Sequence, residues 1–236
     1  MHRSLKIVLF VFTTLISQPG FAAKPVVGVA EFRNAATGTY WWGGGVGWEL
    51  SSMLSNELAN SGDFRVVERT KLEPVLLEQD LAADGRIKKG TGARIGMVTG
   101  AEYLVLGTVT SFESNTANTG GGISFGGISI GGKKKQAYIA VDLRVVNSTT
   151  GELDFVRTVE ARAKGGGLSL GLFKGGFGGN LASEKKTPTG KAIRAVIVEI
   201  TDYLACAMVE QGDCMAEYDA KEKKRRKKLK SSISLD

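Results

Sequence analysis

Two glycine-rich segments constrain the fold of this chain more than any other feature. Residues 120–132 hold seven glycines and residues 165–179 hold eight, together 15 of the chain's 32. Neither segment can be ordinary core. Between the glycines, large apolar residues alternate with serine or glycine, which predicts strands with one aliphatic face and one small, polar face. The alternating residues are Ile123, Phe125, Ile128, Ile130, Leu168, Leu170 and Leu172.

The alternation predicts two β-hairpins, inserted at residues 113–137 and 163–186. Glycine pairs at 126–127 and 175–176 lie where hairpin turns would fall. The arms beside them reach the roughly 9 to 11 residues that a membrane-spanning strand needs, with the seven alternating residues facing lipid. The alternative is a pair of flexible Gly-Ser loops, since each arm supplies only two or three large apolar side chains.

The residues needed for catalysis are not found together. Gly-x-Ser-x-Gly, a pattern typical of a hydrolase nucleophile elbow, occurs at 122–126, 127–131 and 167–171. The only histidine, however, is His2. It lies in a segment that we expect to be removed on export, so a Ser-His-Asp triad is excluded. No other catalytic or phosphate-binding motif is complete. We therefore expect no enzymatic activity, no cofactor and no metal site.

The first 22 residues have the pattern of a secretory signal. Arg3 and Lys6 precede an apolar run at 7–16, and small residues surround a cleavage point near Ala22. The mature chain is then expected in the periplasm or at the outer membrane, without a cysteine near the cleavage point to carry a lipid. No later run of about 18 apolar residues could form a spanning helix, so any membrane segment would be β-structure.

The positive charge is concentrated at the C-terminus. The chain has a formal net charge of +7. Residues 221–236 contribute eight basic and two acidic side chains, and the signal contributes two basic ones, which leaves residues 23–220 at net −1. This distribution argues against a nucleic-acid partner. We expect a basic, disordered tail over 221–236; the alternative is electrostatic contact with anionic envelope polymers or lipid head groups.

The two cysteines, Cys206 and Cys214, lie near the end of a predicted helix. In an oxidising compartment their spacing allows a local disulfide that folds the chain back at Gly212. Two sulfurs without histidine make a poor metal site.

Hydrophobic periodicity predicts one α/β (α+β) domain over residues 23–220, with a mixed sheet and flanking helices. Strands are expected at 26–32, 64–68, 103–112, 138–146 and 153–162. A helix ending at Gly62 is expected from apolar residues at helical spacing, namely Val46, Leu50, Met53, Leu54 and Leu58. A closing helix begins at Thr187-Pro188, with a core stripe of Ile193, Val196, Ile197, Ile200 and Leu204.

Two further helices are expected between these elements. Thr70-x-x-Glu73 matches a capping box that would open a helix extending to about Leu81, although Pro74 weakens the pattern. A short helix is expected at 93–98.

Four stretches together resemble the CsgG family, the outer-membrane channels that secrete curli amyloid subunits. They are residues 27–34, 64–79, 100–109 and 139–153, in the family's order. The resemblance implies an α/β periplasmic domain that sends out two β-hairpins, which a homo-oligomeric ring pools into one transmembrane barrel. It also implies an unfolded secreted polypeptide, curli-like or another surface protein, as cargo and an accessory periplasmic protein as partner.

Family channels narrow at a loop after the first strand, where aromatic and amide side chains form a constriction. The matching loop is 35–47, which makes Tyr40, Trp41 and Trp42 the constriction candidates. The alternative is that these aromatics pack on the domain or on a neighbouring protomer.

The same domain type resembles that of periplasmic activators of peptidoglycan synthases. That resemblance implies a competing function, a soluble periplasmic module that binds an envelope partner while its glycine segments remain loops.

Overall fold

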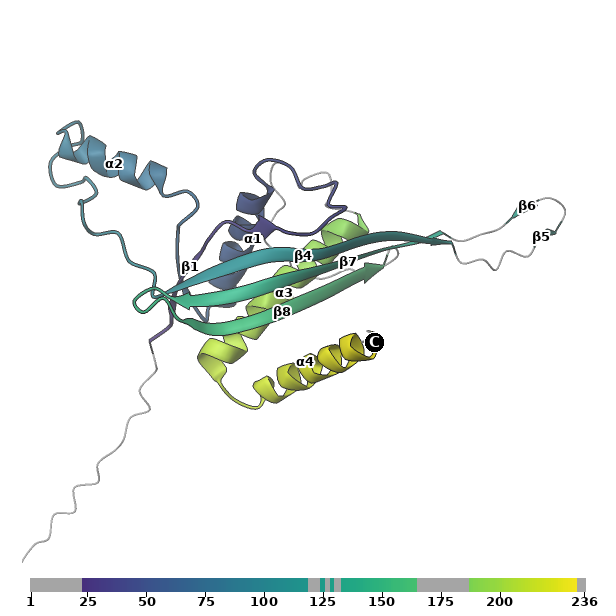
Figure 1. Ribbon diagram of the computed structural model, residues 1–236. Coiled ribbons are helices and arrows are strands. Elements are labelled where there is room, and N and C mark those ends of the chain that lie inside the picture. Colours follow the sequence, from purple (N-terminus) through teal and green to yellow (C-terminus); the bar gives the residue numbers. More distant parts are fainter. Residues whose placement is uncertain (1–22, 119–123, 126–127, 130–132, 165–186, 233–236) are drawn as a thin grey trace, which may run out of the picture.

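The computed structural model describes residues 23–118, 124–125, 128–129, 133–164 and 187–232. A six-stranded mixed sheet forms the centre of the domain, in the order β3-β1-β4-β7-β8, with β2 also paired to β4 (Figure 1). The strands are β1 Val26–Val29, β2 Arg33–Asn34, β3 Arg65–Val67, β4 Tyr103–Asn118, β7 Lys133–Asn147 and β8 Leu153–Lys164. β1 runs parallel to β3 and β4, whereas β4, β7 and β8 form an antiparallel meander. The expected mixed sheet is therefore confirmed.

The pair β4–β7 extends beyond the domain strands expected at 103–112 and 138–146 into the first predicted hairpin. Its register runs from Tyr103 opposite Asn147 to Asn118 opposite Lys133, with a bulge between Val109 and Ser111. Pairing continues where a glycine-rich hairpin was expected, because β5 (Ser124–Phe125) is antiparallel to β6 (Ile128–Ser129), with Phe125 opposite Ile128. The first insertion thus contains the strand pairing that a hairpin requires.

The other hairpin predictions lie outside the described residues. These are Ile123, Ile130, Leu168, Leu170 and Leu172, together with most of the second insertion and the expected signal at 1–22.

Two helices bury the sheet's core face. Helix α1 spans Val46–Ser61 and ends at Gly62, whose φ of +79° favours glycine. Helix α3 spans Pro188–Ala205, and its N-cap Thr187 accepts a hydrogen bond from the Gly190 N–H at 3.1 Å. Such a cap contributes about 1 kcal/mol. Every residue of both predicted stripes is buried, which confirms the two helices.

Alternate residues of β7 supply the sheet's side of this core. Ile139, Val141, Leu143 and Val145 are all buried against the helices. Their two-residue period confirms the predicted strand and places its other residues on the opposite, polar face.

The region between β3 and β4 differs from the prediction. Helix α2 spans Glu73–Ala83 with Leu72 as N-cap, because Thr70 is held by Glu68 instead: the Thr70 hydroxyl donates to Glu68 Oε1 at 2.6 Å. The capping-box prediction is therefore wrong. The prediction of a helix at 93–98 is also wrong, since the chain turns at Ile95–Gly96, where Gly96 has a φ of +78°. Residues 68–102, which we call the α2 lobe, project away from the sheet (Figure 1).

The prediction of a disordered tail at 221–236 is wrong for residues 221–231. Residues Cys214–Ser231 form helix α4, which lies beside the edge strand β8 (Figure 1). Ion pairs within one helical turn stabilise it, from Lys221 to Glu217 at 3.1 Å and from Arg225 to Glu222 at 2.8 Å. Among the described helices, none is both long and apolar enough to cross a bilayer.

Candidate functional site at the hairpin end of the sheet

Both inserted segments leave the domain at the same end of the sheet. β4 and β7 run outward past Phe112 and Ile139 (Figure 1). β8 ends at Lys164, which pairs with Gln136 of β7. The chain re-enters the described domain at Thr187, directly before α3. We call this edge of the domain the hairpin end.

The loop between β2 and α1, residues 35–45, is folded by local hydrogen bonds. The Asn34 side chain donates to Thr39 Oγ1 at 2.7 Å, and its Oδ1 accepts from the Ala36 N–H at 3.0 Å. Gly38 and Gly45 have φ values of +71° and +90°, which allow the sharp turns at each end. The loop therefore has a defined conformation in a single chain.

Trp41 lies inside the domain. Its side chain is 6% exposed, and its ring packs edge-on against Phe112 at a centroid distance of 5.3 Å. The half-buried Trp42 lies beside it at 5.5 Å. Within the described part of the chain, the buried Trp41 Nε1 has no hydrogen-bond partner. This position is the one expected if the aromatics pack on the domain.

Tyr40 has the opposite orientation and is 68% exposed. Its hydroxyl lies 3.1 Å from Thr189 Oγ1 in α3, and its ring meets Phe112 edge-on at 6.0 Å. The structure thus packs Tyr40 and Trp41 on Phe112 at the hairpin end, with Trp42 beside Trp41 and Tyr40 alone projecting. Neither Phe112 nor Thr189 could be identified from sequence, because their partners are about 70 and 150 positions away in the chain.

The base of the loop depends on close backbone contact. A Cβ at Gly47, the second residue of α1, would lie 2.4 Å from the Phe32 carbonyl oxygen. That oxygen belongs to the backbone and cannot turn away.

Gly47→Ala should lower the free energy of unfolding by about 2 kcal/mol, the usual cost of overpacking. Chemical denaturation of the purified protein measures this. Gly43→Ala is the matched control, because a Cβ there meets nothing within 4 Å. Equal stability of the two variants would contradict the proposed packing at the base of the loop.

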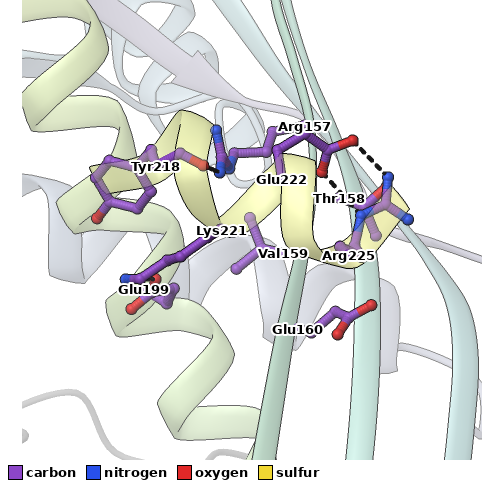
Figure 2. A pocket seen from close by; sticks show the side chains of 9 residues that line it. All are labelled: Arg157, Thr158, Val159, Glu160, Glu199, Tyr218, Lys221, Glu222 and Arg225. Carbon is purple, nitrogen blue, oxygen red and sulfur yellow. Dashed lines mark hydrogen bonds and ion pairs between the residues drawn. The ribbon is translucent and has the colours of Figure 1, made fainter. Parts of the chain in front are cut away.

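A second set of polar residues joins β8, α3 and α4 around a pocket of about 220 Å³ (Figure 2). The Arg157 guanidinium lies 4.9 Å from the Tyr203 ring centroid and 5.0 Å from that of Tyr218, and it donates to the Tyr218 carbonyl. Cation–π contacts of this kind stabilise by about 0.5 to 2 kcal/mol each. Arg157 therefore clamps α4 to the edge of the sheet.

Ion pairs complete this clamp. Lys221 Nζ lies 3.3 Å from Glu199 Oε1 of α3 and also bonds Glu217. Burial, together with nearby Glu199 and Asp202, raises the pKa of Tyr218 to about 12, so its hydroxyl stays neutral. The charged residues that α4 contributes to this pocket, Lys221, Glu222 and Arg225, are each paired with another residue of the chain, which fits a structural role for the pocket (Figure 2). Among the described residues, no cluster of three His, Cys, Asp or Glu side chains could hold a metal ion.

A disulfide closes the connection between α3 and α4. Cys206 begins the π-helical turn η2 (Cys206–Glu210) that extends α3, and Cys214 begins α4. The two are bonded, with their Cα atoms 6.0 Å apart. Gln211, with a φ of +48°, reverses the chain between them. The bond limits how far α4 can swing from α3.

Comparison with known proteins identifies the family. The model of the family "Curli production assembly/transport component CsgG" matches residues 10–233. The chain belongs to the CsgG family. The resemblance predicted from the sequence is confirmed, and this is a CsgG-like envelope protein from a family of secretion components.

One CsgG relative, the curli production assembly/transport component of Salmonella typhimurium, is 31% identical over 107 residues. That alignment covers 44% of this chain and 39% of the relative, so the chain matches well under half of the relative's length.

Solved structures show weaker likeness. A hypothetical protein from Chlamydia trachomatis has a TM-score of 0.46 at 15% identity, covering 78% of this chain and 97% of that one. A PelC dodecamer from Paraburkholderia phytofirmans has a TM-score of 0.38 at 14% identity, covering 78% of this chain and 91% of that one. Similarity at this level does not transfer a function or an assembly.

Proposed function

We propose that this CsgG-family protein forms a homo-oligomeric ring at the outer membrane and conducts secretion of an unfolded, curli-like or other surface polypeptide. The observation that carries the proposal is the shared hairpin end, where both inserted segments and the aromatic loop are attached. A ring of such domains would direct all its hairpins toward one membrane and its aromatic loops toward the base of the resulting barrel.

The ring follows from the physics of strands in lipid. Two hairpins from a single chain would leave unpaired backbone N–H and C=O groups at their edges, and hydrocarbon cannot satisfy them. Pairing with hairpins of neighbouring protomers closes the sheet and removes the edges. Ile123, Phe125, Ile128, Ile130, Leu168, Leu170 and Leu172 would then face lipid, with the small polar residues lining the lumen.

Within this channel, the three aromatics would have different roles. Tyr40 projects from the loop and is steadied by Thr189 and Phe112, so it is our candidate for the side chain that narrows the pore. Trp42 is half-buried and lies beside Trp41. Trp41, buried against Phe112, would hold the loop in position rather than line the pore.

Tyr40→Ala should raise the single-channel conductance of the reconstituted protein, because the side chains at a constriction set its diameter. Tyr40→Phe keeps the ring and loses only the bond to Thr189, so its conductance should remain close to that of the wild type. Planar-bilayer recording measures both variants. A Tyr40→Ala channel with unchanged conductance would exclude Tyr40 from the constriction.

A second candidate function has its own support. The α2 lobe leaves several large apolar side chains exposed, namely Val75, Leu76, Leu77, Ile95 and Met97. Val75 and Met97 line one surface pocket, and contiguous exposed apolar surface marks a protein contact. Such a surface suits a soluble periplasmic module that binds an envelope partner such as a peptidoglycan synthase. If the protein forms a channel, an accessory protein would bind the same surface equally well.

A further inference from the structure

Helix α4 carries a row of lysines on the face turned away from the domain. Lys223, Lys227 and Lys230 follow one another at spacings of four and three residues, which places them on one side of the helix. That side is opposite Tyr218, Glu222 and Arg225, the residues that line the pocket against β8. All three lysines are exposed, and none forms an ion pair with any residue that the structure describes.

The orientation of this lysine row is fixed by the inner face of the helix. Arg157 of β8 contacts the rings of both Tyr203 and Tyr218, and Lys221 is paired with Glu199 of α3 (Figure 2). The disulfide between Cys206 and Cys214 restrains the start of α4. Rotation of the helix about its axis would break these contacts, so the three lysines stay on the outside.

Two acidic residues of the sheet lie near the inner side of α4. A pocket of about 500 Å³ separates the helix from the polar face of the sheet. Its lining brings Glu113 and Glu160 of the sheet together with Lys224 and Lys228 of the helix. These carboxylates can offset positive charge on the inner side of α4. On the outer side, Asp219 lies one turn before Lys223 without forming an ion pair to it within the described chain, and residues 223–230 contain no acidic residue.

The lysine row also points toward the hairpin end. Tyr218, in the first half of α4, contacts Arg157, in the first half of β8. Lys228 and Leu229, near the end of α4, line the same pocket as Glu113 and Tyr138, which lie beside the outward extensions of β4 and β7. Figure 1 shows α4 running along β8 toward that end. The density of positive charge therefore rises toward the edge from which the hairpins leave.

We propose that Lys223, Lys227 and Lys230 form an electrostatic docking surface for a bilayer that contains anionic phospholipids. The inference rests on the proposed function in one respect, since it takes the hairpin end as the side that faces the membrane. Lysines that are solvated and lack a shaped pocket suit a surface of many diffuse negative charges better than one small ligand. Leu229, about half exposed, adds only one apolar side chain, so attraction is mainly electrostatic.

The test is flotation of the purified mature protein with vesicles of phosphatidylcholine alone or with about 30% phosphatidylglycerol. We expect binding to the anionic vesicles that is reversed by about 0.5 M salt, because exposed charges are screened at that ionic strength. The triple variant K223Q/K227Q/K230Q should lose affinity by on the order of 100-fold, or roughly fivefold for each lysine. Its α4 should remain folded, since glutamine and lysine have similar helix propensity.

The matched control is K71Q/K88Q/K89Q, which removes the same charge from exposed lysines of the α2 lobe, beyond the opposite end of the sheet. It should bind like the wild type. Equal loss in both triple variants, or no loss in the α4 variant, would overturn the proposal. Equal affinity for soluble polyphosphate at the same phosphate concentration would overturn the assignment to a bilayer. Hairpin insertion is measured separately as the fraction that remains bound in high salt, so loss of docking can be distinguished from loss of the channel.

Discussion

Replacing Ile128 and Leu170 with aspartate should abolish insertion of the protein into the outer membrane. Both residues belong to the aliphatic face of the predicted hairpins, and Ile128 pairs with Phe125 in the described β5–β6 ladder. Charge on the lipid face of a membrane strand is costly, and a ring repeats that cost in every protomer. The measurement is the amount of protein that resists urea extraction from isolated outer membranes.

The control for this prediction uses neighbouring positions with the opposite orientation. Ser129 and Ser169 alternate with the apolar residues, so in a barrel they would face the aqueous lumen. The variant Ser129→Asp with Ser169→Asp should still insert. If both double variants remain in the membrane to the same extent, the glycine-rich segments are not membrane strands.

Trp41→Ala should lower the free energy of unfolding by about 3 to 5 kcal/mol, the usual cost of truncating a large buried aromatic side chain. The variant loses the packing of the indole ring on Phe112 and Trp42 and leaves a cavity beside the sheet. Urea denaturation followed by circular dichroism measures the loss. The size of this effect separates a residue that builds the loop from one that only lines a pore.

Tyr40→Ala provides the comparison within the same loop. Its side chain is largely exposed, so its removal should cost less than about 1 kcal/mol. We therefore expect the free energy of unfolding to depend on Trp41 and the channel conductance to depend on Tyr40. A Trp41→Ala variant as stable as the wild type would show that Trp41 does not belong to the core.

Elements with strong apolar periodicity could be predicted from the sequence. In α1, α3 and β7 one side is buried against the core, so apolar residues recur along that side at the helix or strand period. That period can be read directly from the sequence. Gly62 and Thr187 marked helix ends because their effects are local.

The errors arose where distant contacts replace periodicity. Helix α4 has no apolar stripe, and it is held by Arg157, which is 61 positions from Tyr218 in the chain. No local pattern reveals such a pair. The helix expected at 93–98 failed because its apolar residues, Ile95 and Met97 among them, are exposed in the single chain rather than packed against the domain.

The candidate site was predictable in composition but not in arrangement. Three consecutive aromatics identified the loop, yet only tertiary packing shows that Trp41 turns inward to Phe112 while Tyr40 turns outward to Thr189. Adjacent residues in a loop have no fixed period that would assign their directions.

The most direct test of the ring is sizing of the mature protein on native gels after soluble periplasm has been separated from urea-washed, detergent-extracted outer membrane of a two-membrane bacterial host. A ring-forming channel should give one large, discrete species confined to the membrane extract. A monomer or dimer released with the soluble periplasm would contradict it and would favour the soluble binding module.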